Sequence, residues 1–209
     1  MAEDRHGARR HDAAGVVLAA GRSSRAGCIK ALARIDGKPL VARTVRALRD
    51  GGCAEVLVVV GPPHAEAIAR VVPDARRVDN PDPSRGMLSS LQEALRVLAP
   101  AARGHVVVAL VDQPRVSPAI VRQLLEVLSR EEVDAAVPRH AGRGGHPYAL
   151  AWSALAPLLA APPSASTRDV LAQLRRASVE VDDSSILEDL DTADALRAAH
   201  AEFEEREAR

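Results

Sequence analysis

The sequence predicts a single α/β domain built in three layers around a mostly parallel sheet. Short apolar runs rich in valine alternate with amphipathic stretches rich in alanine, leucine and arginine. Strands separated by helices of about ten residues form βα units, and the resulting sheet is parallel and buried on both faces. The chain has 209 residues, enough for one such domain with a sizeable core or at most two small ones.

Four strands are predicted in the first half of the chain, each as a short apolar run bounded by turn or polar residues. They are expected over residues 15–20, 55–61, 76–80 and 105–112. The first two runs are rich in valine and end at a glycine loop, and the fourth is the most apolar. The third is weak and leads into a turn rich in proline.

Helices are predicted between these strands, over residues 39–52, 64–72, 87–98 and 117–130. Pro39 suits a first helical turn, and Gly51 and Gly52 suit a helix end. The third helix places four leucines on one face, at positions 88, 91, 95 and 98. In the fourth helix, Ser117 is expected as the N-cap and Pro118 at the first helical position.

The alternation loosens after residue 132. We expect a strand over 135–138, two short helices near 152–160 and 166–176, a last strand over 178–183 and a closing helix over 192–207. No internal repeat or linker interrupts the pattern. The sequence therefore predicts one domain over residues 14–209, preceded by a disordered tail of residues 1–13.

Composition excludes several classes of protein. With 28 Lys+Arg against 28 Asp+Glu, the formal net charge of +0 gives no electrostatic reason to expect a nucleic-acid binder. Only three aromatic residues occur, too few for a base-stacking surface. The apolar runs are too short to span a bilayer, and no secretory signal is visible. Cys28 and Cys53 form neither a disulfide framework nor a zinc pattern, so a cytoplasmic setting is expected.

The loop after the first strand carries glycines and positive charges that suit a triphosphate. It begins at Gly21, contains Arg25 and Gly27, and ends at Lys30, one of two lysines in the chain. Glycines let backbone N–H groups approach phosphate oxygens, while Arg25 and Lys30 supply charge. The loop matches neither the P-loop nor the G-x-G-x-x-G spacing, so a dinucleotide fold is not indicated. An ordinary surface turn explains the same residues equally well.

Carboxylates after two later strands are candidate ligands for a divalent cation over the same crevice. Asp112 follows the most apolar strand, and Mg²⁺ prefers one or two carboxylates together with substrate phosphates. Asp189 and Asp191 share a side if the chain there is extended. Capping or turn roles are the alternatives, and they are favoured for Asp112 on aspartate statistics and for Asp191 at the start of the closing helix.

Two further segments carry polar groups suited to a ligand. His146 lies in a loop rich in glycine and could bind a phosphate or transfer a proton. The segment Gly86–Ser90 opens a helix whose free N–H groups could bind an anion or a base edge. The alternative for this segment is an ordinary helix start with Leu88 and Leu91 in the core.

Five segments in the same order resemble the MobA/MocA nucleotidyltransferase family, and its molybdenum cofactor cytidylyltransferase branch most closely. They are LAAGRSSRAGCIK (18–30), GMLSSL (86–91), VDQP (111–114), GGHPYAL (144–150) and VDDSSILEDLDTADAL (181–196). The resemblance covers nearly the whole chain. It implies a three-layer α/β/α Rossmann-like sandwich of the nucleotide-diphospho-sugar transferase type.

The resemblance also implies a reaction and a set of site residues. A nucleoside monophosphate would pass from an NTP to a phosphorylated acceptor, such as molybdopterin, with release of pyrophosphate and with Mg²⁺ as cofactor. The nucleotide would be bound by Leu18, Ala19, Ala20, Gly21, Arg25, Lys30, Asn80 and Ser90. Arg25, Lys30 and Asp112 would be catalytic, Asp112 with Asp189 or Asp191 would hold the metal, and His146 would face the acceptor.

Details of the motifs bear on the substrate. Ala20 stands where guanylyl-transferring relatives tend to carry glycine, which favours CTP over GTP. Ala26, Ser184 and Ala193 depart from the family's Met, Gly and Pro, and these changes bear on the acceptor rather than on phosphoryl chemistry. A transient contact with a molybdoenzyme is a further expected partner. The alternatives are a non-catalytic nucleotide-binding or chaperone module, an oxidoreductase and a sugar-phosphate nucleotidyltransferase.

Overall fold

The computed structural model describes residues 13–21, 29–99, 104–113, 115–162 and 164–190, together with residues 192, 194, 195 and 198. The predicted tail up to residue 12 and nearly all of the predicted closing helix lie outside these ranges. Ala13, the last residue of the predicted tail, is instead the first residue of strand β1.

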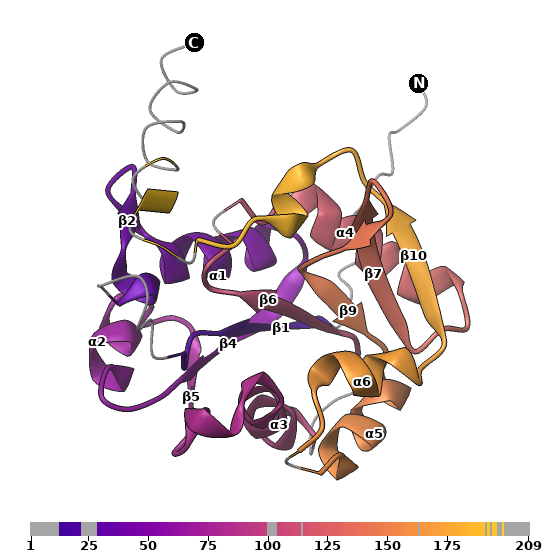
Figure 1. The fold of residues 1–209 in the computed structure, drawn as a ribbon, viewed down its shortest axis with the longest axis horizontal. Helices are drawn as coiled ribbons and strands as arrows, with labels where there is room; N and C mark the ends of the chain where they lie inside the picture. Colours follow the sequence, from indigo (N-terminus) through magenta and orange to yellow (C-terminus); the bar gives the residue numbers. More distant parts are fainter. Residues whose placement is uncertain are drawn as a thin grey trace, which may run out of the picture.

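A single mixed sheet forms the centre of the molecule (Figure 1). Its strands run in the order β10–β7–β9–β6–β1–β4–β5, and β8 pairs with β7. The strands are β1 Ala13–Leu18, β4 Cys53–Val60, β5 Arg76–Asp79, β6 Val106–Leu110, β7 Ala135–His140, β8 Arg143–Gly144, β9 Tyr148–Leu150 and β10 Arg176–Glu180. Neighbours are parallel from β6 to β5 and between β7 and β10, whereas β9 runs antiparallel between β6 and β7.

Helices cover both faces of this sheet, so the predicted three-layer α/β fold is confirmed (Figure 1). They are α1 Leu40–Asp50, α2 Ala65–Arg70, α3 Met87–Leu98, α4 Pro118–Arg130, α5 Leu155–Ala160 and α6 Thr167–Ala172. Val17 and Val58 pack in the core beneath α1 and α4, while their neighbours Val16 and Leu57 pack toward α3 and α5. This alternation explains why the central strands are apolar throughout.

The N-terminus of α4 follows the predicted capping chemistry, whereas Pro39, predicted in the first turn of a helix, is the residue before α1. Ser117 accepts a hydrogen bond from the Ala119 N–H at 3.2 Å, and Pro118 begins α4. Pro39 precedes α1, which ends at Asp50 with Gly51 as its C-cap. Among the described residues, no helix is long and apolar enough to cross a bilayer.

The structure corrects several predicted elements. The short hairpin formed by β2 Arg34–Ile35 and β3 Lys38–Pro39 was not predicted, although Asp36 and Gly37 are a recognisable two-residue turn with φ of 51° and 70°. Strand β9 was also missed because three buried residues carry no periodicity.

Boundaries in the second half of the chain also differ. Residues Trp152–Ala154 form a 3₁₀ turn before α5 rather than part of a helix. The helix expected to reach residue 176 ends at Ala172, because Arg176 already belongs to β10. This last strand ends at Glu180, and Ser184–Leu187 form another 3₁₀ turn.

Candidate active site

A pocket of about 220 Å³ opens beyond the carboxyl ends of β1 and β6. Ligands in open parallel sheets bind at this edge, where loops from neighbouring strands converge. Four segments line the pocket: Leu18–Gly21 after β1, Ile29–Ala31, residues around the start of α3 (Pro83, Gly86, Met87, Ser90) and Leu110–Asp112 after β6.

The floor of the pocket is backbone with small side chains. Ala19 and Ala20 are buried, and the Ala19 N–H donates to the Val59 carbonyl at 2.9 Å, which extends the sheet beyond β1. A Cβ on Gly61 would lie 2.5 Å from Cγ of Pro83 and 3.3 Å from the Ala20 carbonyl oxygen. Because Gly61 has no side chain, the 3₁₀ turn Pro83–Arg85 before α3 can pack closely against the backbone that follows β1.

Lys30 and Asp112 meet in this pocket. The Lys30 Nζ donates to Oδ2 of Asp112 at 3.1 Å, and their side chains are 11% and 22% exposed. Lys30 opens a 3₁₀ turn, whereas Asp112 follows β6, 82 positions later in the chain. The capping role considered for Asp112 is wrong, because Ser117 caps α4, whereas the turn role is confirmed, because Asp112 lies in the turn after β6. The pair places a positive and a negative charge side by side in the strand-end pocket.

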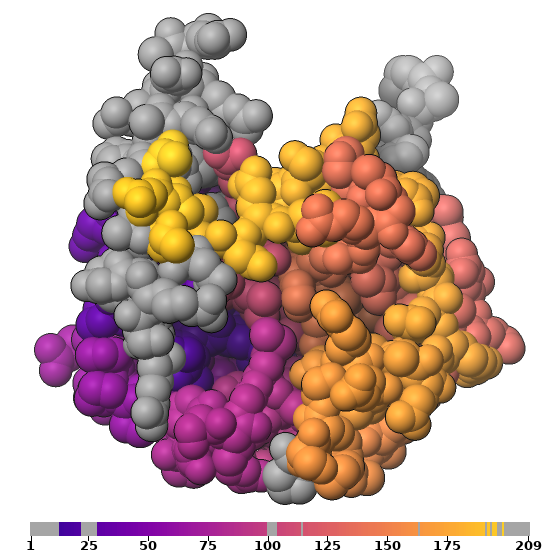
Figure 2. All heavy atoms as spheres, in the orientation of Figure 1, coloured from indigo at the N-terminus to yellow at the C-terminus, as the bar shows by residue number. Residues whose placement is uncertain are grey.

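Asp189 is held beside this pair by Gln113. The segment that leaves the turn at Ser184–Leu187 crosses from the β7 and β10 side of the molecule toward the β2 side (Figures 1 and 2). The Leu190 N–H donates to the Asp112 carbonyl at 3.0 Å, and Gln113 Nε2 donates to Asp189 Oδ1 at 3.2 Å. Gln113 is only 3% exposed. Sequence reasoning missed its role, although it directly follows Asp112 in the VDQP motif.

His146 lies in the loop before β9, against the segment that leads to Asp189. Its backbone N–H donates to the Ile186 carbonyl at 3.0 Å, and its ring lies 5.3 Å from that of Tyr148 between centroids. Burial lowers the pKa of His146, and the nearby carboxylates of Asp189 and Asp112 oppose that shift without cancelling it. Near neutral pH the imidazole is therefore uncharged and can accept or donate one hydrogen bond.

The first turn of α3 contributes Ser90 to the pocket, and hydrogen bonds from the buried Asn80 hold this turn in place. Asn80 is 1% exposed, and its amide donates to the hydroxyls of Ser89 at 3.0 Å and Ser90 at 2.9 Å. The structure thus places Asn80 beneath the helix start rather than in the pocket lining. Leu88 and Leu91 are buried, so core packing and a pocket-facing N-terminus occur in the same segment.

The residues present suit a hard divalent cation. No group of three or more His, Cys, Asp or Glu side chains could hold a metal within the described ranges. Mg²⁺ takes one or two carboxylates when substrate phosphates complete its coordination, and Asp112 and Asp189 would be these carboxylates. Arg25 and Asp191, two further predicted site residues, lie outside the described part of the chain.

A mostly parallel α/β sheet with a pocket at the carboxyl ends of its strands is the architecture typical of nucleotide-binding proteins. Residues 15–179 match the model of the MobA-like NTP transferase domain. The chain belongs to this family.

The curated relatives include enzymes named for two different bases. The chain is 26% identical over 194 residues to the molybdenum cofactor cytidylyltransferase of Escherichia coli K12, covering 91% of this chain and 96% of the relative. It is 38% identical over 111 residues to the molybdenum cofactor guanylyltransferase of Xanthomonas euvesicatoria, covering 53% of this chain and 52% of the relative. The match to the cytidylyltransferase is long enough to include the His146 loop and the segment that contains Asp189.

Another relative carries a different kind of name. The nicotine blue oxidoreductase of Paenarthrobacter nicotinovorans is 40% identical over 113 residues, covering 53% of this chain and 54% of the relative. The match therefore spans about half the length of this relative, as it does for the guanylyltransferase.

A solved structure resembles nearly the whole chain. Rv0371c from Mycobacterium tuberculosis H37Rv superposes with a TM-score of 0.80 at 28% identity, covering 91% of this chain and 98% of that one. A second structure of Rv0371c, with a TM-score of 0.75 and 25% identity, is a complex with manganese. A divalent metal is thus bound by a structural relative of this chain.

Proposed function

We propose that this chain transfers a nucleoside monophosphate from an NTP to a phosphorylated acceptor and releases pyrophosphate. CTP is the favoured donor, and molybdopterin cofactor is the favoured acceptor. The ion pair between Lys30 and Asp112 in the strand-end pocket carries the proposal, since it gathers opposite charges from distant parts of the chain at the triphosphate's expected position.

Alignment and charge neutralisation would provide the catalysis. The acceptor phosphate is already an anion, so in-line attack on the α-phosphorus needs no strong base. Lys30 and Arg25 would offset the charge that grows on the pyrophosphate leaving group. Asp112 and Asp189 would hold Mg²⁺, which when bound would supply positive charge that stabilises the phosphate oxygens during transfer. The neutral His146 imidazole would position the acceptor by a hydrogen bond.

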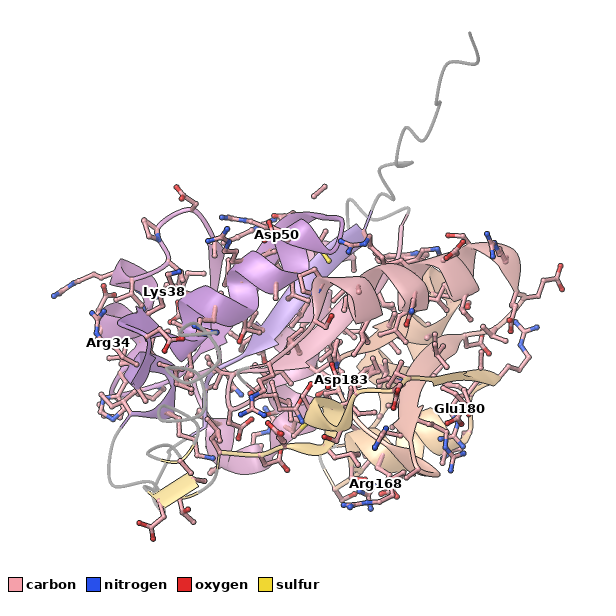
Figure 3. All side chains as sticks on the ribbon, turned by 90° about the horizontal axis from the view of Figure 1, so that it is seen from above. Arg34, Lys38, Asp50, Arg168, Glu180 and Asp183 are labelled. Carbon is pink, nitrogen blue, oxygen red and sulfur yellow. The ribbon has the colours of Figure 1, made fainter. Side chains whose placement is uncertain are left out.

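The test is a pyrophosphate-release assay with a panel of NTPs, Mg²⁺ and phosphorylated acceptors that includes molybdopterin. We expect Lys30→Ala and Asp112→Ala each to lower turnover about a hundredfold or more, as for removal of one key electrostatic group. Lys38→Ala is the matched control, because the other lysine of the chain lies in the β2–β3 hairpin and is exposed (Figure 3). Near-normal turnover by folded Asp112→Ala would remove this carboxylate from the reaction.

The choice of base is a separate prediction. Ala20 contributes to the pocket floor and is 6% exposed, and the LAAG form resembles the cytidylyl branch. We expect calorimetry to show tighter binding of CTP than of GTP in the presence of Mg²⁺. Equal or tighter binding of GTP contradicts this part of the proposal and leaves the transfer reaction intact.

Oxidoreductase activity is the second candidate function, and the match to nicotine blue oxidoreductase favours it. The chain has no G-x-G-x-x-G loop after β1, which argues against a nicotinamide dinucleotide site. Measured binding of NAD(P)H together with no pyrophosphate release would favour the oxidoreductase. Nucleotide binding without any release would instead favour a non-catalytic module.

A further inference from the structure

A second hollow of about 280 Å³ lies between β7, β8 and β10, away from the strand-end pocket. Its lining consists of Val137, Arg139, Gly144, Arg176, Ala177 and Ser178. None of these residues lines the first pocket. Both arginines belong to the neighbouring parallel strands β7 and β10, at the end of the sheet where β10 forms the edge (Figure 1).

The sheet register puts the polar groups on one face. Val137 pairs with Ser178 and Arg176 with Ala135, and paired residues on adjacent strands point to the same side. Ala135 is buried in the core beneath α3 and α5, so Arg176 and Ser178 lie on the face of the sheet that these two helices cover farther along. Along β10, Arg176 and Ser178 are exposed, so no element covers this part of the face.

The charges of the two arginines are not neutralised by a carboxylate in the described part of the chain. Arg139 donates one guanidinium N–H to the Gly142 carbonyl, and its buried Nε meets no acceptor there. Arg176 and Ser178 make no side-chain hydrogen bond or ion pair with any described residue. Glu180 pairs in register with Arg139 but forms no ion pair with it. Two guanidinium groups and a hydroxyl therefore line one hollow, and several of their hydrogen-bond donors have no acceptor among the described residues.

The hollow is connected to the candidate active site by one short loop. Gly144 lines the hollow, and His146, two residues later, lies near Asp112 and Asp189. Gly145 between them packs on the Ile186 backbone, where a Cβ would come within 2.1 Å of the carbonyl oxygen. A molecule whose phosphate reacts near His146 would enter the hollow along this loop at the Gly144 and Arg139 end, with Arg176 farther along β10.

We propose that Arg139, Arg176 and Ser178 form an oxyanion subsite for a second anionic group on the acceptor, distant from its reacting phosphate. Guanidinium forks match the oxygens of phosphates and carboxylates in paired hydrogen bonds, and the serine hydroxyl adds a donor. This assignment rests on the proposed transfer reaction, and it adds that the acceptor carries more than one negatively charged group.

The subsite is tested first without any turnover. Amide NMR of the full chain, titrated with inorganic phosphate at constant ionic strength, should show shifts at Gly144, Ala177 and Ser178. Arg176→Gln removes an exposed side chain without a described contact, so its fold should be retained. We expect Arg139→Gln and Arg176→Gln each to weaken the phosphate response about tenfold. Arg143→Gln, which removes one charge from the same hairpin outside the lining, should leave it unchanged.

The absence of shifts at these three amides, or equal phosphate binding by all three variants, would overturn the subsite. The acceptor role is decided by kinetics with the acceptor that supports pyrophosphate release. Arg176→Gln should raise the KM of the acceptor about tenfold while the KM of the NTP stays constant, and an unchanged acceptor KM would overturn that role. If no acceptor supports release, the proposed function fails, whereas the phosphate titration still decides whether the hollow binds oxyanions.

Discussion

At the scale of single residues, the candidate site depends on a few charges held partly out of water. Lys30 Nζ and Asp112 Oδ2 are 3.1 Å apart. Because both side chains are mostly buried, solvent screens their attraction less than it would at the surface. Removal of either one leaves the other charge partly buried, so single substitutions are expected to affect both stability and turnover. Gln113 shows that a neutral amide can share in this arrangement by fixing the orientation of Asp189.

A second charged residue links stability to pH, away from the site. Asp134 accepts hydrogen bonds from the Ser153 hydroxyl at 2.7 Å and from the Arg175 backbone N–H and guanidinium at 3.1 Å. The Arg175 guanidinium, followed by the Ser153 hydroxyl, lowers the pKa of Asp134 to about 2. Because the folded-state pKa is depressed, the stabilisation is complete above the unfolded-state pKa of about 4 and is lost as pH falls toward 2.

We therefore expect Asp134→Asn to lower the free energy of unfolding by about 1 kcal/mol at pH 7, allowing for solvent screening. The difference from the wild type should shrink between pH 4 and pH 3. Urea denaturation at pH 7, 5, 4 and 3 measures it. A difference that stays constant over this range would show that the carboxylate charge is not what stabilises this corner.

At the scale of elements, the site depends on close contact between the His146 loop and the turn at Ser184–Leu187. Both belong to motifs that the sequence showed, but their contact was not predictable from it. Four residues lie between Gly145 and Leu150, whereas forty lie between Gly145 and Ile186. Periodicity describes only what is local, whereas this contact arises from the antiparallel insertion of β9 between β6 and β7.

Substitution of Gly145 tests this contact. The added Cβ of Gly145→Ala would lie 2.1 Å from the Ile186 carbonyl oxygen and 3.0 Å from its Cβ, so one backbone must move. We expect a loss of about 1–3 kcal/mol in the free energy of unfolding and a lower turnover as His146 shifts. Gly144→Ala is the stability control, because its Cβ would meet Cγ1 of Val137 at an ordinary 3.5 Å. Equal stability of the two variants would contradict the account.

At the scale of the whole molecule, valine-rich runs separated by amphipathic helices were enough to predict the three layers. The same reasoning could not find β9 or place its neighbours, since short buried strands lack a repeating pattern. The motifs in the sequence predicted Lys30, Asp112, Asp189 and His146 as site residues. The topology of the chain places the segments that carry them at one edge of the sheet. Figure 3 shows Arg34 and Lys38 at the opposite side of the molecule from Arg168 and Glu180, with Asp183 between.

The central claim is that one triphosphate and its cation bind between Lys30 and Asp112. A crystal structure with a non-hydrolysable CTP analogue and Mg²⁺ tests it most directly. We predict that the phosphates lie over the Leu18–Gly21 backbone with Lys30 on a phosphate oxygen and Asp112 on the metal. A nucleotide bound elsewhere, with the Lys30–Asp112 ion pair intact and distant from both phosphate and metal, would contradict the account.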